Sequence, residues 1–276
     1  MSIPKIIHYV WVGDPNKKSQ LFYKCLESWK KYCPDWEIRE WNESNVDIDK
    51  SLYAKEAYSL KKYGFVPDYI RAKILYDCGG VYLDTDVELT KSLNDLIEND
   101  FLISFENEVH LETAVLGSCK GHPFAKMMTD FYISYPYIID GKPDFTPSTP
   151  IWTNFLKKYY GLKLKNSYQK LSLLPEYKDK VSEDELSKTV TILPRDYFCP
   201  LNYTTKELKK TENTYAIHYF DASWFSKKFS KREKFLKCLY KIFGKKIFSF
   251  FTKSYVKSVN KKLEKRIKKY NIKIFN

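Results

Sequence analysis

Two aspartates separated by one residue, Asp84 and Asp86, directly follow a β-forming run at 81–83. In a strand, side chains two positions apart point to the same side. Two carboxylates on one side repel each other unless a cation lies between them, and oxygen ligands of this kind suit Mg²⁺ or Mn²⁺. Such sites commonly combine one or two carboxylates with substrate phosphates. The pair therefore predicts a metal–diphosphate site at the end of a strand, although an isolated Asp-x-Asp pair is more often a solvated turn.

The residues ahead of this pair favour the metal interpretation. Apolar side chains at helical spacing predict a helix over 67–78. Gly79-Gly80 end it, because glycine accepts the left-handed backbone of a helix cap. Asp68 and Arg71 are three residues apart within this helix and therefore share one face. An acid–base pair on a helix that leads into the two aspartates is a setting that favours a functional site over a chance turn.

A nearly continuous apolar and aromatic run over 3–12 predicts a first strand buried on both faces. Trp11 lies at its carboxyl end, and ligands of open α/β sheets bind beyond the carboxyl ends of strands. The indole could stack on a flat base, although its position alone is equally consistent with a buried core tryptophan. His8 lies within the same run and is expected to be a core histidine without a chemical role.

Strand and helix patterns alternate along the chain, as in α/β proteins. A helical stripe at 22–29 and a second strand at 36–38 follow the first strand. No GxGxxG motif follows that first strand, which disfavours a dinucleotide-dependent dehydrogenase. Further helices are expected at 50–63, 123–135 and 152–160, and further strands at 101–106, 113–117, 190–193 and 215–220.

The segment from Asp68-Tyr-Ile-Arg71 through Gly79-Gly80-Val81-Tyr82-Leu83 to Asp84-Thr-Asp86 resembles the sugar-binding region of DXD-type retaining glycosyltransferases. It is most similar to the capsular-polysaccharide and mannosyltransferase enzymes of glycosyltransferase family 32, and more distantly to the catalytic domains of the large clostridial glucosylating toxins. The resemblance spans residues 3–226. It implies a GT-A-type fold, a Rossmann-like mixed α/β sheet flanked by helices, with a UDP- or GDP-sugar donor and Mn²⁺ or Mg²⁺ as cofactor.

The resemblance also implies roles for the residues of this motif. Asp86 would bind the metal directly, and Asp84 would contact the ribose and the metal. Asp68 and Arg71 would hold the hydroxyls of the donor sugar. Trp11, in a motif of the Ile-His-Tyr-Val-Trp type, would pack on the base of the nucleotide. The metal would neutralise the departing diphosphate as a Lewis acid, with retention of the anomeric configuration and no assigned catalytic nucleophile.

A second constellation lies near the end of the resembling region. His218, Ser223 and Trp224 match a His-x(4)-Ser-Trp segment that closes over the diphosphate and metal in the family. His218 is thus a candidate metal or phosphate contact, and Ser223 and Trp224 are candidate donors to the diphosphate; a lone histidine is otherwise more often structural. Two segments depart from the family pattern, Glu112-Thr113-Ala114 and Ser148-Thr149-Pro150. Both are expected near the donor sugar or the acceptor, so sugar specificity cannot be transferred.

Charge divides the chain into two expected parts, a catalytic domain at 1–226 and a basic, amphipathic, helical tail at 227–276. The tail holds eighteen Lys and Arg and two acids, a net +16, whereas the whole chain carries +13, so the remainder carries 13 − 16 = −3. Aromatic and aliphatic residues recur among the lysines at three- and four-residue steps. Such a helix could attach to an anionic membrane surface; alternatively, the apolar stripe docks on the catalytic body and the lysines are a solvated face.

The family resemblance implies a glycosyltransferase, and the basic tail predicts that it is cytoplasmic and attached peripherally to the inner face of the cell membrane. Its acceptor would be a growing, lipid-linked bacterial glycan of a capsule or surface polysaccharide. No Cys-x-x-Cys occurs among the six cysteines, which are expected to be reduced, and the N-terminus does not read as a signal peptide. Two other classes stay open: a toxin-like protein glycosyltransferase, and a non-enzymatic membrane- or nucleic-acid-binding protein. Nucleic acid is the less expected partner, because no recognisable nucleic-acid module accompanies the charge.

Overall fold

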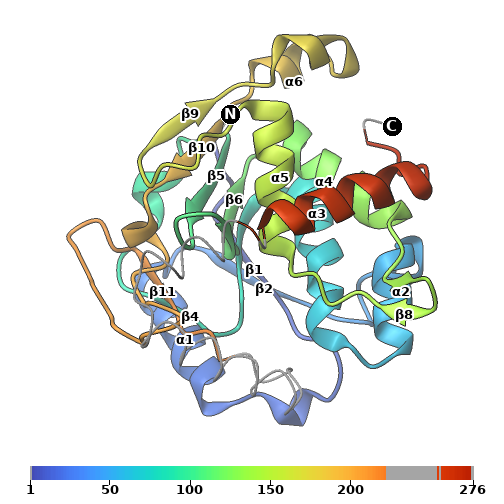
Figure 1. Cartoon of the computed structure of the whole chain (residues 1–276). Helices are drawn as coiled ribbons and strands as arrows, with labels where there is room; N and C mark the ends of the chain where they lie inside the picture. Colours follow the sequence, from blue (N-terminus) through green and yellow to red (C-terminus); the bar gives the residue numbers. More distant parts are fainter. Residues whose placement is uncertain (1, 222–253, 255, 275–276) are drawn as a thin grey trace.

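The computed structural model describes residues 2–221, 254 and 256–274, and its framework is a seven-stranded sheet (Figure 1). The strand order is β2-β1-β3-β6-β5-β10-β9. Its strands are β1 (Ile6–Val10), β2 (Glu37–Trp41), β3 (Gly80–Leu83), β5 (Phe101–Phe105), β6 (Leu111–Ser118), β9 (Gln169–Leu171) and β10 (Val190–Leu193).

The sheet is mixed in direction. The apolar strand β1 lies between β2 and β3 and is parallel to both, as the strand–helix–strand pattern at the start of the chain predicts. β6 is antiparallel to β3 and β5, and β9 is antiparallel to β10. The predicted mixed α/β class, with helices flanking the sheet, is therefore confirmed.

Helices cover both faces of the sheet and enclose two cores. One core packs four helices of the body and the C-terminal helix against Tyr82 and the β5 residues that share its face, and the other packs Phe22 and Trp29 of α1 against Ile7 and Leu83. Neighbouring residues of β3 thus point to opposite cores, as strand geometry requires. The helices of the body are α1 (Gln20–Tyr32), α2 (Leu52–Ser59), α3 (Val66–Cys78), α4 (Pro123–Ser134), α5 (Ser148–Tyr160) and α6 (Glu183–Ser187).

Small elements complete the described body. An antiparallel ladder joins β4 (Val87–Leu89) to β11 (Ala216–His218), and a hairpin pairs β7 (Ile138–Ile139) with β8 (Lys142–Pro143). Within the described residues the predicted strands and helices have counterparts, but β4, β7, β8, β9 and α6 were not expected, because elements of two to five residues carry little periodicity. No helix within the described ranges is long and apolar enough to cross a membrane.

The Gly79-Gly80 step carries the chain from α3 into β3. Both residues have positive φ, +69° and +99°, which side-chain-bearing residues rarely adopt. A Cβ at Gly80 would also lie 2.7 Å from His8 Nε2, so this step needs glycine for space as well as conformation. His8 is fully buried, and burial lowers its pKa to about 4. Its Nε2 pairs with the Gly79 carbonyl, at 2.8 Å, so the predicted role as a satisfied core histidine is confirmed.

The end of the predicted tail packs on the body. Residues 256–269 form a helix, drawn in red in Figure 1, whose Leu263 is 1% exposed and lies in the larger core together with Ile272. Arg266 pairs with Asp144 at 2.7 Å, and Lys269 pairs with Asp140. For these residues, the apolar stripe docks on the catalytic body, which was the alternative to membrane insertion. The rest of the tail (227–253, 255, 275 and 276) and residues 222–226 of the predicted catalytic domain lie outside the described residues, so the boundary at 226 stays a prediction.

Replacing Leu263 with alanine is expected to lower the free energy of unfolding by about 2–5 kcal/mol, because it leaves a cavity in a shared core. Urea denaturation followed by circular dichroism measures the loss. Lys261→Ala is the matched control on the exposed face of the same helix and is expected to change stability by less than about 0.5 kcal/mol. Equal stability of Leu263→Ala and the wild type would mean that this helix does not contribute to the core.

Candidate metal and donor-binding site

Asp84 and Asp86 lie in the turn that joins β3 to β4. The Asp84 backbone N–H donates to the Ala114 carbonyl at 2.8 Å, and its carbonyl accepts from the Val87 N–H at 3.1 Å. The placement at a strand end is as expected, but the geometric reason was wrong. The i and i+2 side chains converge because a tight turn follows the last strand residue, Leu83, and not because strand residues alternate.

The short strand β11 brings a histidine to this turn. His218 pairs with Val87 in the ladder between β11 and β4, and its Nε2 lies 3.5 Å from Asp86 Oδ1. One ligand atom from each of Asp84, Asp86 and His218 lies within 4.8 Å of the others. Two carboxylates and an imidazole at this separation fit a divalent cation. The structure thus brings together the three predicted metal residues, from segments more than 130 positions apart.

The turn is held in place by backbone and side-chain contacts. The Asp221 N–H donates to Asp86 Oδ2 at 2.8 Å, and the Tyr219 N–H donates to the Asp86 carbonyl. The Tyr82 hydroxyl donates to Asp84 Oδ1 at 2.5 Å. Both carboxylates are therefore oriented before any ligand binds, with side-chain exposures of 28% for Asp84 and 16% for Asp86.

Charges around His218 oppose the effect of burial. Burial favours the neutral imidazole, but the carboxylates of Asp86 and Glu112 outweigh it and raise the pKa of His218 to about 9. Burial likewise opposes ionisation of Asp86, yet His218 and hydrogen bonds from the backbone hold the pKa of that carboxyl below its usual value. The carboxylates therefore concentrate negative charge at this site, and a bound cation would offset it.

Arg71 connects the helix α3 to the metal turn. Its guanidinium lies 3.1 Å from Asp68 and 3.4 Å from Asp84, and it donates to the Thr113 carbonyl at 2.5 Å. Burial would lower the pKa of Arg71, but Asp84, Tyr82 and Asp68 raise it strongly, so the side chain stays charged. The predicted pair between Asp68 and Arg71 is present, and it extends to the first aspartate of the DXD motif.

The Asp68–Arg71 pair faces protein groups. Asp68 and Arg71 are each only 4% exposed, and the Tyr53 hydroxyl donates to Asp68 at 3.3 Å. Burial raises the pKa of Asp68 to about 6, against the opposing effect of Arg71. The geometry shows these two residues as supports of Asp84, and their contact with donor-sugar hydroxyls stays a prediction.

The two segments that depart from the family pattern meet beside this pair. The hydroxyls of Thr113 and Ser148 lie 2.9 Å apart, and the Ser148 hydroxyl also acts to lower the pKa of Asp68, against the larger effect of burial. The strand β6 and the first turn of α5 thus form one wall of the same site. This contact places both segments beside Asp68, which the family resemblance assigns to the donor sugar; their own contact with a donor or an acceptor stays a prediction.

Of the predicted nucleotide-binding residues, only Trp11 is described. It follows β1, is half-buried, and donates from its indole Nε1 to the Asp14 carbonyl at 3.0 Å. Its ring packs against Phe22, with centroids 6.0 Å apart. Stacking on a base therefore stays a prediction. Ser223 and Trp224 lie outside the described residues, two and three positions beyond Asp221.

One acidic residue of the site was not assigned a role from sequence. Glu112 lies in β6 with its Oε1 3.5 Å from His218 Nδ1, and burial raises its pKa to about 7 although His218 lowers it. The signal was present as a lone acid in the otherwise apolar and small-residue strand LETAVLGS.

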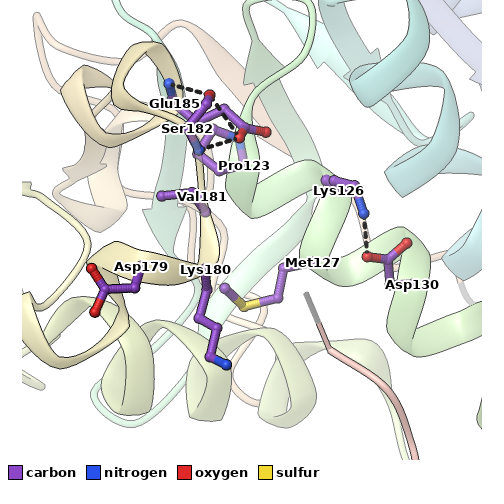
Figure 2. Close-up of a pocket in the computed structure, with 9 residues that line it drawn as sticks. All are labelled: Pro123, Lys126, Met127, Asp130, Asp179, Lys180, Val181, Ser182 and Glu185. Atoms are coloured by element: carbon purple, nitrogen blue, oxygen red, sulfur yellow. Dashed lines mark hydrogen bonds and ion pairs between the residues drawn. The ribbon is translucent and has the colours of Figure 1, made fainter. Parts of the chain in front are cut away.

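A separate pocket of about 310 Å³ lies between α4 and the segment formed by the 3-10 helix Pro175–Lys180 and α6 (Figure 2). Three of its charged lining residues have protein partners: Lys126 pairs with Asp130 at 2.7 Å, and Glu185 closes the capping box of α6 with Ser182. The pocket shares no lining residue with the Asp84–Asp86–His218 cluster.

Residues 19–102 match the family described as "Glycosyltransferase sugar-binding region containing DXD motif". This match contains Asp68, Arg71, Asp84 and Asp86, and it confirms the resemblance to DXD-type glycosyltransferases drawn from the motif.

A curated sequence relative is "Inositol phosphoceramide mannosyltransferase 3" of Schizosaccharomyces pombe, 29% identical over 131 residues, or 45% of this chain. The chain spans 35% of the length of that relative. Similar solved structures include "PaToxG Glycosyltransferase", with a TM-score of 0.43 and 16% identity over 57% of this chain and 69% of that one. A glycosyltransferase "involved in the glycosylation of the major capsid of PBCV-1" has a TM-score of 0.40 and 9% identity, covering 84% and 98%.

Proposed function

We propose that this protein is a metal-dependent glycosyltransferase of the GT-A type that transfers a hexosyl group, with retention, from a UDP- or GDP-sugar to a glycan. One observation carries the proposal. Asp84, Asp86 and His218 converge to within 4.8 Å, and the two aspartates belong to the segment that matches the DXD sugar-binding region. A carboxylate pair within such a region is suited to hold a cation against a diphosphate.

Each residue of the site is assigned a role in metal binding or in positioning a metal ligand. Asp86, Asp84 and His218 would hold the cation, which supplies Lewis-acid neutralisation of the departing diphosphate when bound. Arg71 holds Asp84 in place through its 3.4 Å contact, and the Asp221 N–H does the same for Asp86. Carboxylate oxygens suit both proposed ions, whereas an imidazole ligand favours a transition-metal ion, so Mn²⁺ is the better fit of the two.

The acceptor is proposed to be a lipid-linked glycan of a bacterial capsule or surface polysaccharide. The matched relative is named for transfer of mannose to inositol phosphoceramide, which is an acceptor with a lipid portion. That name supports a sugar donor and a membrane-associated acceptor as the first classes to test. We place the enzyme on the cytoplasmic face of the membrane, where nucleotide sugars and lipid-linked acceptors meet.

A donor screen tests the proposed function. UDP- and GDP-sugars are incubated with the full chain in Mn²⁺, in Mg²⁺ and in excess chelator, and the released nucleotide is measured. One donor class is expected to be hydrolysed slowly without an acceptor, and chelator is expected to abolish the release. Absence of turnover for all donors in both metals, with a folded protein, would contradict the proposal.

Membrane attachment is proposed to act through charge over the described end of the tail. The apolar residues of the 256–269 helix face the core, and so they are not available for insertion into lipid. Its opposite face carries exposed basic side chains at Lys257, Lys261, Lys262, Lys265 and Lys268. Basic residues near an anionic surface are worth on the order of 1 kcal/mol each.

The full chain is therefore expected to sediment with vesicles that contain anionic phospholipid at low salt, and to be released as salt rises. The Debye screening length falls to about 8 Å at physiological ionic strength, so a purely electrostatic attachment to the vesicle weakens steeply as salt rises. A variant with Lys257, Lys261, Lys265 and Lys268 changed to Gln should sediment less, whereas neutral vesicles should capture neither protein. Failure of the wild type to sediment at low salt would mean that these lysines are a solvated face.

A further inference from the structure

Glu112 is a buried carboxyl group that the roles above do not use. Its side chain is 1% exposed. Neither carboxylate oxygen has a hydrogen-bond partner at bonding geometry within the described residues, although the Cys199 thiol lies beside the group. Burying a carboxyl without partners is unfavourable. Its presence in the strand wall of the site therefore points to a partner that it meets when the site is in use.

The atom that faces Glu112 is also without a partner. His218 Nδ1 is buried, has no hydrogen bond within the described part of the chain, and lies 3.5 Å from Glu112 Oε1. The other ring nitrogen, Nε2, lies 3.5 Å from Asp86 Oδ1. The imidazole thus stands between two carboxylates, with one nitrogen directed to each.

We propose that Glu112 is a positioning residue that accepts the Nδ1–H of His218, and that it thereby turns the Nε2 lone pair toward Asp84 and Asp86 as a metal ligand. A neutral imidazole has one N–H and one lone pair, so fixing the first fixes the second. Histidines that bind metals almost always donate their other N–H to a carboxylate, carbonyl or water. This inference rests on the proposed function, because it assigns His218 to the metal.

The geometry separates this role from direct ligation. The ligand atoms that converge within 4.8 Å come from Asp84, Asp86 and His218, and Glu112 is not among them. Its carboxyl lies on the Nδ1 side of the ring, away from the nitrogen that faces Asp86. Glu112 is therefore placed to act on the metal through the orientation and tautomer of His218, and not as a ligand.

The first test measures Mn²⁺ affinity by the electron paramagnetic resonance signal of free Mn²⁺, at saturating UDP or GDP, whichever the wild type binds. Glu112→Met removes the acceptor at similar volume and is expected to weaken Mn²⁺ binding by about 10- to 100-fold. Glu112→Gln keeps an acceptor oxygen and is expected to lose less. Asp77→Asn removes a carboxylate that pairs with Lys73 on α3 and is 44% exposed, and it is expected to leave Mn²⁺ affinity unchanged.

The second test reads the tautomer directly. The chain has four histidines, so selective ¹⁵N labelling gives a simple spectrum, and a His218→Asn variant assigns the resonance. In the diamagnetic Mg²⁺–nucleotide complex of the wild type, His218 is expected to carry its proton on Nδ1. In Glu112→Met that proton is expected to shift toward Nε2.

The outcomes separate the two proposals. Unchanged Mn²⁺ affinity in Glu112→Met, or a wild-type His218 protonated on Nε2 in the complex, overturns the role of Glu112 and leaves the enzyme proposal standing. A wild type that binds no Mn²⁺ with either nucleotide overturns the proposed function itself. If Glu112→Met does not fold, the Glu112→Gln affinity and the wild-type tautomer still decide.

Discussion

Replacing Asp86 with asparagine is expected to lower donor turnover by about 100- to 1,000-fold, the usual size of removing one preorganised electrostatic stabiliser from a reacting site. Asn is nearly isosteric with Asp, and its side-chain oxygen can still accept from the Asp221 N–H that now donates at 2.8 Å. What it loses is the negative charge that faces His218 and the cation. The measurement is kcat/KM for nucleotide release, with Mn²⁺ varied at each donor concentration.

Asp77→Asn is the matched control for this prediction. Asp77 lies on the last turn of α3 and pairs with Lys73, with a side-chain exposure of 44%. An exposed i,i+4 pair contributes about 0.3–0.5 kcal/mol to stability, so turnover should be unchanged. If Asp86→Asn keeps wild-type turnover and wild-type dependence on Mn²⁺, the assignment of Asp86 to the metal is wrong.

Replacing Arg71 with alanine is expected to lower the free energy of unfolding by about 3–5 kcal/mol, because it leaves buried carboxylate charge without its counter-ion. The guanidinium is 4% exposed, contacts Asp68 and Asp84, and donates to the Thr113 carbonyl. Denaturant unfolding measures the loss. The double variant Asp68→Asn/Arg71→Ala should recover part of it, since one unpaired charge is removed.

Lys73→Ala, which breaks an exposed pair on the same helix, is the control for stability and should change it by less than about 0.5 kcal/mol. Arg71→Lys keeps the positive charge but not the planar guanidinium group. Comparing its donor-sugar turnover with its nucleotide affinity tests the predicted sugar contact. A larger loss of donor-sugar turnover than of nucleotide affinity supports that contact. Equal losses with an intact fold assign Arg71 to a structural ion pair, and an Arg71→Ala protein of wild-type stability contradicts the buried network.

The sequence was most informative where the structure is local. The helix α3, its end at Gly79-Gly80 and the strand β3 follow from spacing and from two glycines, which are all within one short segment. The approach of His218 to Asp86 could not be derived in this way, because a residue 132 positions away reaches the turn only through the ladder of β11 and β4. There the family resemblance, and not the pattern of residues, supplied the prediction.

Two features escaped prediction for physical reasons. The apolar stripe of the C-terminal helix fits a membrane surface or a protein core equally well, and only the packing of Leu263 and Ile272 decides for the core. Glu112 was visible as a departure from the family pattern, but its partner is a nitrogen on another strand. A lone acid in an apolar strand is the signal that such a partner exists, although it does not identify it.

Calorimetric titration of UDP and GDP, with and without Mn²⁺, tests the metal-dependent site most directly. One nucleotide is expected to bind the wild type at least about tenfold more tightly with Mn²⁺, since its diphosphate and the Asp84–Asp86–His218 cluster share the cation. Asp86→Asn should remove that gain. Nucleotide binding that needs no metal and survives Asp86→Asn unchanged would contradict the account.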